Sequence, residues 1–197
     1  MKKKLFIFVP VFLCTVIAIT AITPVITVSE DISSKVFRLH ILANSDSDED
    51  QALKLKVRDK ILSVSEDLYG NCSSVEDAVN ISKKNIKLFK ETAQKVIAFY
   101  GYEYDTRVYV TKEYFNTRVY DDFTLPAGIY DSLKIEIGEG KGHNWWCVMF
   151  PSVCLSGCTD DFDETLTPEE QEMIKSGKYI VRFKAVEIYE KIKSKIA

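Results

Sequence analysis

The amino-terminal segment constrains this chain more than any other feature of its sequence. Residues 5–28, LFIFVPVFLCTVIAITAITPVITV, are 24 residues without a charge, preceded by three lysines at positions 2–4 and followed by Glu30. A hydrocarbon core needs about 20 apolar residues in a helix, whereas the core of a cleavable signal has about 7 to 15. The length therefore favours a membrane anchor. Because lysines stay on the cytoplasmic side, the segment predicts that the rest of the chain is exported.

Two prolines leave open whether this segment is cleaved. Pro10 and Pro24 bracket a proline-free stretch of 13 residues, which is the length of a signal core, yet no A-x-A cleavage site follows it. Residues 1–29 are therefore predicted to be a signal peptide or a membrane anchor, with residues 5–28 in the membrane. Residues 30–197 are predicted to form a single extracytoplasmic domain.

The charge balance of the exported part excludes one class of partner. The chain has 26 basic and 29 acidic residues, and without the first 29 residues, which hold three lysines and no acid, 23 bases remain against 29 acids. This acidic balance argues against nucleic-acid binding. With 46% apolar residues, the chain can bury a core.

Helical periodicity follows one short strand. Residues 36–43, VFRLHILA, alternate apolar and polar side chains as a strand does, with His40 on the polar face. Ser47 and Ser74 have the pattern of helix N-caps, each followed by apolar residues at helical spacing. The pattern predicts two helices in tandem, the second ending before Gly101.

From Tyr102 onward the pattern becomes that of strands. In residues 133–137, LKIEI, apolar side chains point to one side and a lysine and a glutamate to the other, which predicts a sheet with one packed face. Residues 145–150, WWCVMF, predict a covered strand, residues 152–167 a loop and residues 168–195 a helical segment. Because helices and strands are segregated, we expect an α+β fold, mainly antiparallel sheet packed with two or three helices.

The sequence offers no catalytic constellation. Its two histidines, His40 and His143, are far apart, and neither G-x-S-x-G nor H-E-x-x-H occurs. Residues 46–50, DSDED, imitate the start of a calcium loop, but Gln51 and Val57 stand where that loop needs glycine and glutamate. We therefore interpret these acids as the first turn of a helix and expect no metal and no other cofactor.

Four cysteines lie in the exported part of the chain. Export favours disulfides over free thiols, and a turn at Pro151 could bring Cys147 and Cys154 together, so this is the preferred pair. The alternative is a zinc site that adds His143 and Cys158 to these two cysteines.

Two adjacent tryptophans give the strongest local indication of a binding surface. In a strand, Trp145 and Trp146 must point to opposite sides, so one can enter the core while the other lies at the surface. An exposed indole is unfavourable unless a partner covers it. The outward tryptophan is therefore predicted to contact a partner.

Several segments resemble the stage II sporulation protein R family. They are FRLHILANSDSDEDQALKLKVRDKIL, YFNTRVY, LPAGIYDSLKIEIGEGKGHNWWCVMFP and the apolar amino terminus, and the resemblance runs from about Val36 to Cys154. It implies a signalling protein made in the forespore and exported into the space between the two membranes that separate forespore from mother cell. It also implies that the protein is not an enzyme but is needed to activate a membrane-embedded aspartic protease in the mother-cell membrane. That protease removes the pro-sequence from the sigma factor sigma-E.

The resemblance brings no catalytic residues, so the matching segments supply only candidate contacts. The candidate partner-binding residues are Asn44, Asp46, Arg118, Asn144, Trp145 and Trp146. One alternative function is an extracytoplasmic hydrolase acting on cell-wall material, with His40, His143 and Asp46 in its site. Another is a passive, membrane-anchored structural protein, which predicts no effect on proteolysis.

Overall fold

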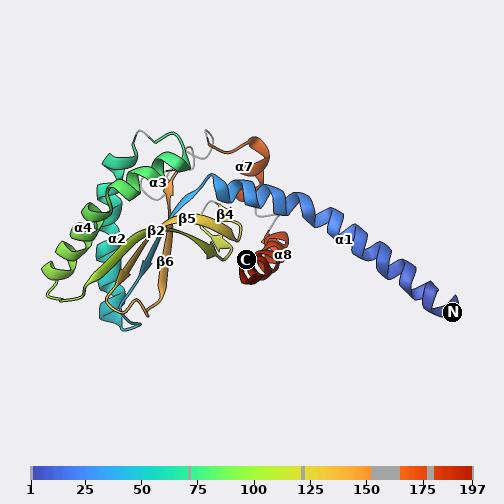
Figure 1. The fold of residues 1–197 in the computed structure, drawn as a ribbon, viewed down its shortest axis with the longest axis horizontal. Helices are drawn as coiled ribbons and strands as arrows, with labels where there is room; N and C mark the ends of the chain where they lie inside the picture. Colours follow the sequence, from blue (N-terminus) through green and yellow to red (C-terminus); the bar gives the residue numbers. More distant parts are fainter. Residues whose placement is uncertain (1, 71, 121–122, 152–164, 177–179, 197) are drawn as a thin grey trace. The chain divides into compact units, whose positions relative to one another are not determined.

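The computed structural model describes residues 2–70, 72–120, 123–151, 165–176 and 180–196 (Figure 1). Within these residues six helices and six strands form an α+β fold, as predicted. In chain order they are α1 (Lys2–Ser34), β1 (Phe37–Leu42), α2 (Asp48–Tyr69), α3 (Val75–Lys84), α4 (Ile86–Phe99), β2 (Thr106–Phe115), β3 (Arg118–Val119), β4 (Thr124–Leu125), β5 (Gly128–Ile137), β6 (Asn144–Phe150), α7 (Pro168–Lys175) and α8 (Ile180–Ile196).

The chain divides into two compact units. Unit 1 comprises Met1–Ser33, Tyr114–Ile129 and Glu169–Ala197, and unit 2 comprises Ser34–Glu113 and Tyr130–Pro168. Unit 2 therefore holds the long strands and α2 to α4. Two expectations stay predictions. They are the boundary between the signal peptide or anchor and the rest of the chain at residue 29, and the assignment of residues 30–197 to one extracytoplasmic domain.

A four-stranded sheet in the order β2-β5-β1-β6 is the centre of unit 2. β1 pairs in parallel with β5 and antiparallel with β6. Arg107 near the start of β2 contacts Glu136 near the end of β5, and Lys112 near the end of β2 contacts Asp131 near the start of β5. The two strands therefore run in opposite directions, as in an antiparallel pair. The sheet is therefore mixed, and the expected antiparallel pairing holds only for its two outer pairs. The parallel pair is possible because α2 to α4 supply the long connection that it requires.

The core of unit 2 lies between one face of this sheet and its helices. Leu133, Ile135 and Ile137 are buried in it, so the predicted alternation along β5 is confirmed. They pack with apolar residues at strand spacing in β1 and at helical spacing in α2 and α4, among them Leu39, Ile41, Leu53, Val57, Ile61, Phe89, Ala93 and Ile97. The helices thus cover one face and leave the other to polar side chains.

The predicted helix caps are present, but the second predicted helix is interrupted. The hydroxyls of Ser47 and Ser74 accept hydrogen bonds from backbone N–H groups three residues on, at 3.2 and 3.1 Å. At Asn85 the side-chain amide donates to the carbonyl of Ile81 at 2.9 Å, and the backbone leaves the helical region. The expected single helix is therefore two, α3 and α4, because Asn85 competes for a carbonyl of the last turn.

Unit 1 contains α1, α7, α8 and the two-stranded pair β3–β4. Lys193 of α8 forms an ion pair with Glu30 of α1 at 2.5 Å. The segment expected to be helical over residues 168–195 forms α7 and α8, while most of the expected loop over residues 152–167 lies outside the described residues. In the part of the chain that the structure describes, no helix combines the length and the apolar character needed to cross a membrane. Membrane insertion of residues 5–28 stays a prediction.

Candidate partner-binding surface

Three segments of unit 2 meet at the end of β1: the turn after β1, the first turn of α2 and the turn between β5 and β6. Asn44 accepts a hydrogen bond from the backbone N–H of Glu139 at 3.0 Å and donates to Asp50 at 2.9 Å. The carbonyl of Ala43 accepts from the backbone N–H of Gly142 at 3.0 Å. These five residues form what we term the turn clamp. The candidate contact Asn44 therefore has a structural role, which no local pattern indicated.

Asp50 is the buried charge of the turn clamp. Its side chain is 4% exposed and accepts a hydrogen bond from the Ser45 hydroxyl at 2.6 Å in addition to the one from Asn44. Burial raises the pKa of Asp50, but the hydrogen bonds from Ser45 and Asn44 lower it more, so the pKa lies below its ordinary value. The other acids of residues 46–50 lie in the first turn of α2 or, in the case of Asp46, just before it. Among the described residues, no group of three or more His, Cys, Asp or Glu side chains could hold a metal ion.

Substitution of Asp50 by asparagine is expected to flatten the acid dependence of stability. Because the pKa of Asp50 is lower in the folded chain than in the unfolded chain, where it is about 3.9, the carboxylate stabilises the fold at neutral pH. This contribution is lost as the pH falls through the folded pKa. Urea unfolding at several pH values should show a smaller loss of stability on acidification in Asp50→Asn than in the wild type. The exposed Asp67 of α2 is the control, and an Asp50→Asn profile as steep as that of Asp67→Asn would contradict the assignment.

Asp46 and His143 form an exposed pair beside the turn clamp. Asp46 Oδ1 lies 2.5 Å from His143 Nδ1 and accepts from the backbone N–H of His143 at 2.6 Å. The side chains are 56% and 77% exposed, respectively. The turn between β5 and β6 thus brings His143, a residue of the alternative hydrolase site, next to the candidate contact Asp46 at an exposed surface.

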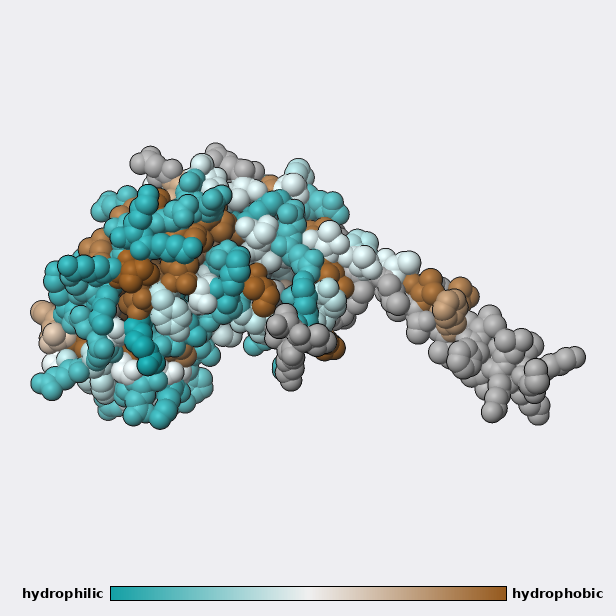
Figure 2. Space-filling view, in the orientation of Figure 1, coloured by the Kyte–Doolittle hydropathy of each residue, from teal (hydrophilic) through white to brown (hydrophobic). Residues whose placement is uncertain are grey.

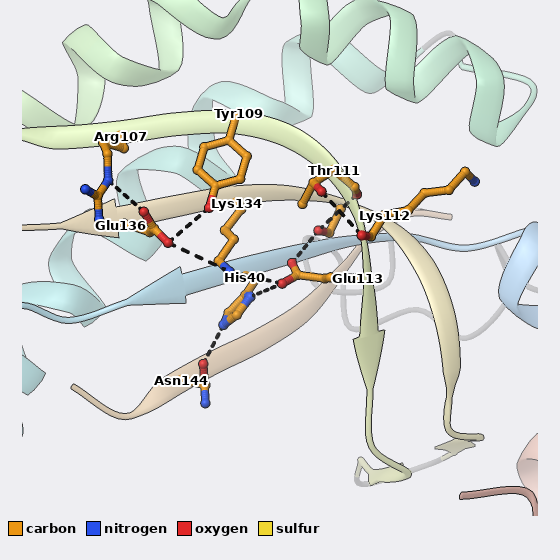
Figure 3. Close-up of polar contacts among 10 residues, drawn as sticks. His40, Arg107, Tyr109, Thr111, Lys112, Glu113, Lys134, Glu136 and Asn144 are labelled. Atoms are coloured by element: carbon orange, nitrogen blue, oxygen red, sulfur yellow. Dashed lines mark hydrogen bonds and ion pairs between the residues drawn. The ribbon is translucent and has the colours of Figure 1, made fainter. Parts of the chain in front are cut away.

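The sheet face opposite the helices carries a network of charged side chains (Figure 3). His40 is 6% exposed, with Nδ1 2.9 Å from Glu113 and Nε2 2.5 Å from Asn144 Oδ1. Ser132 donates to Glu113 at 2.5 Å, and Lys134 lies 3.3 Å from the same carboxylate. We term these five residues the sheet-face network. His40 and the candidate contact Asn144 hold each other in place within it.

Ionisation of Glu113 is maintained by its neighbours in the sheet-face network. Burial raises the pKa of Glu113, but hydrogen bonds from His40 and Ser132 and the charge of Lys134 lower it more, so the pKa is below its ordinary value. For Lys134, burial lowers the pKa and Glu113 raises it, and the result is a raised pKa. Both groups are therefore charged at neutral pH, and the network is an ion pair supported by hydrogen bonds.

The two tryptophans point to opposite faces of the sheet, as predicted. The guanidinium of Arg58 in α2 lies 4.9 Å from the centre of the Trp145 ring, which packs against the core of unit 2. Trp146 lies edge-to-face against His40, with ring centres 5.8 Å apart. Trp146 is therefore the outward tryptophan, and it is half-buried.

Arg118 belongs to unit 1, whereas the other five candidate contacts belong to unit 2. It lies in β3, paired with Leu125 of β4, and its side chain is exposed beside Val119, which is 64% exposed. Its role as a contact stays a prediction.

The cysteines of the exported part differ in state. Cys147 is disulfide-bonded, whereas Cys72 carries a free thiol. Cys154 and Cys158 lie outside the described residues, so the pairing of Cys147 with Cys154 stays a prediction. A disulfide at Cys147 leaves no thiolate there for the alternative zinc set.

Alkylation of variants in which one cysteine is replaced by serine tests this pairing. If Cys147 is bonded to Cys154, Cys158→Ser should leave Cys147 protected from alkylation, whereas Cys154→Ser should expose it. The opposite result, with Cys147 protected in Cys154→Ser and alkylated in Cys158→Ser, would assign the bond to Cys158.

Sequence reasoning missed the polar side chains that β2 contributes to the sheet face opposite the helices. Arg107, Tyr109 and Glu113 alternate with residues of the other face, a period-two signal present in TRVYVTKEYF. Arg107 and Tyr109 bind Glu136 of β5 at 2.8 and 3.0 Å. The period alone does not reveal the partners, because Glu113 binds a histidine 73 residues earlier in the chain.

Comparison with known protein families connects this architecture to one of them. The family model described as stage II sporulation protein R matches residues 33–160, which include all of unit 2 up to residue 160. The chain belongs to the stage II sporulation protein R family. A curated relative, Stage II sporulation protein R of Bacillus subtilis (strain 168), is 32% identical over 178 residues, covering 87% of this chain and 78% of the relative. No solved structure matches the chain. The predicted resemblance is confirmed, and membership of the family supports a role in sporulation signalling.

Proposed function

We propose that the exported part of this chain is a contact activator. It docks onto a membrane-embedded aspartic protease of the mother-cell membrane and shifts that protease toward the arrangement that cleaves pro-sigma-E. The observation that carries the proposal is the family match over residues 33–160, which covers almost all of unit 2 and residues 114–129 of unit 1.

Docking activates the protease through a difference in affinity for its two states. A ligand that binds both states equally shifts nothing, and a shift from mostly inactive to mostly active needs about 5.5 kcal/mol of differential binding. A few aromatic and arginine anchors supply energies of this size at protein interfaces. Trp146, half-buried and on the outward face, and the exposed Arg118 are the anchors that we propose.

The positions of the histidines favour contact over hydrolysis. A hydrolase site built from His40, His143 and Asp46 needs all three in one cleft. His143 pairs with Asp46, whereas His40 is buried between Glu113 and Asn144. The two histidines thus pair with different carboxylates, and Nε2 of His40, the nitrogen that would act as the base, is already engaged by Asn144.

Export is part of the proposal and has its own expected result. Lysines at positions 2–4 and the uncharged residues 5–28 should carry everything after about Glu30 across the membrane. A reporter that works only outside the cytoplasm, fused after Asp31, should be active, and the same fusion lacking residues 5–28 should be inactive. Activity of a cytoplasm-only reporter at this position would contradict export.

The proposal is tested in a spore-forming host that lacks its own member of this family. Expression of the full chain in the forespore should restore cleavage of pro-sigma-E, measured by immunoblot of the mother-cell sigma factor. His143→Ala should restore cleavage as well, because His143 is not catalytic in this account. Loss of cleavage in that variant, with normal export and stability, would favour the hydrolase, and no restoration by a stable, exported wild type would contradict activation altogether.

A further inference from the structure

A groove lies between α2 and α4 in unit 2. Two adjoining hollows of about 600 and 320 Å³ share Lys56 and Tyr100 in their walls. The larger is bounded by residues of both helices, and the smaller extends from α2 to Tyr102 at the start of the strand region. Figure 2 shows apolar patches between hydrophilic side chains over the helices of this unit. We term this feature the α2–α4 groove.

Exposed aromatic side chains line one end of the groove. Phe99 is 82% exposed and Tyr100 is 47% exposed, and their rings pack edge-to-face with centres 5.2 Å apart. Val96, one turn before Tyr100, lies half-buried in the same wall. These neighbouring side chains form an apolar patch beside a hollow, and such a patch, unlike a single exposed apolar side chain, is typical of an interaction site.

The rim of the groove is basic. Lys56, Lys60 and Lys95 border the larger hollow, and within the described part of the chain none of them has a carboxylate at ion-pair distance. The acid in the same wall, Asp59, is already engaged by Arg58 at 2.6 Å. Glu49 borders only the smaller hollow. Positive charge therefore surrounds the aromatic end, although the chain as a whole is acidic.

We propose that the α2–α4 groove binds an acidic, amphipathic polypeptide segment of the protease. Carboxylates of that segment pair with the three lysines, and an apolar side chain enters the hollow beside Phe99 and Tyr100. Charge complementarity selects an acidic partner, and the concave shape suits a helix or an extended segment better than a flat lipid surface. This inference rests on the proposed function and adds to its anchors, Trp146 and Arg118, a further docking surface and the chemistry of the partner segment.

Binding of the full chain to the detergent-solubilised protease tests the inference separately from sigma-factor cleavage. Lys60→Glu combined with Lys95→Glu should weaken binding about tenfold or more, and Phe99→Ser should do the same. Salt should weaken wild-type binding more than it weakens binding of the lysine variant, since the variant has lost the screened attraction. The matched control is Lys83→Glu combined with Lys84→Glu, two exposed lysines of α3 outside the groove, which should bind as the wild type does.

Each contrary result has a distinct meaning. If the groove variants bind the protease as tightly as the control, the groove is not a docking surface, and the proposed function stands. If the wild type does not bind the protease, the proposed function fails and this inference fails with it. If the lysine variant loses binding only to vesicles of phosphatidylcholine and phosphatidylglycerol, the groove is a lipid site and the inference is overturned.

Discussion

Gly142→Ala is expected to lower the free energy of unfolding by about 2 to 3 kcal/mol. A Cβ atom at this position would overlap the backbone carbonyl of Ser45 and lie 2.6 Å from its carbon atom. The backbone cannot simply move away, because the N–H of Gly142 donates to the carbonyl of Ala43 at 3.0 Å in the turn clamp. The substitution therefore separates the turn between β5 and β6 from the start of α2.

Gly70→Ala is the matched control for this prediction. An added Cβ there meets its nearest atom at 3.4 Å, an ordinary van der Waals contact, and the backbone of Gly70 is in the right-handed helical region. Urea unfolding of both variants should show a large loss of stability for Gly142→Ala and no comparable loss for Gly70→Ala. Similar stabilities would mean that the turn clamp is not held as tightly as its contacts indicate.

Arg118→Ala combined with Trp146→Ala is expected to reduce cleavage of pro-sigma-E more than tenfold. Arginine and tryptophan anchors at interfaces cost 2 kcal/mol or more each when truncated, which corresponds to about thirtyfold in affinity. The measurement is the ratio of processed to unprocessed sigma factor in the complemented host. Normal cleavage by a stable, exported double variant would remove both residues from the contact surface.

Two variants make this result specific to contact. Trp146→Phe keeps an aromatic ring against His40 and should retain most of the stability, so comparison with Trp146→Ala separates packing from partner binding. Alanine at the 6%-exposed His40 is not a suitable control, because it would remove one of the hydrogen bonds to the Glu113 carboxylate and leave that carboxylate with Ser132 and Lys134 alone among the described residues.

Local features of this fold could be predicted from the sequence because their causes are local. Ser47 and Ser74 cap helices through hydrogen bonds three residues away, and residues 133–137 show their buried face by a period of two. The opposite orientation of Trp145 and Trp146 follows from the same period. Each of these features is set by residues within one or two turns of the chain.

Features that join distant segments could not be predicted in this way. The parallel pairing of β1 with β5 follows from the path of the connecting helices, which periodicity does not encode. Asn44 binds the backbone of Glu139, 95 residues later, so its structural role is invisible in the local pattern. The α2–α4 groove likewise depends on the placement of two helices whose apolar stripes predicted only that each faces a core.

Reconstitution of the purified full chain with the solubilised protease and pro-sigma-E tests the central claim most directly. The account predicts that the protease cleaves the pro-sequence when the chain is present and that His143→Ala supports cleavage as well as the wild type does. Cleavage should also disappear when the aspartates of the protease are inactivated, since the chain itself breaks no bond. Cleavage that persists with an inactivated protease, or that is unchanged by addition of the chain, would contradict activation by contact.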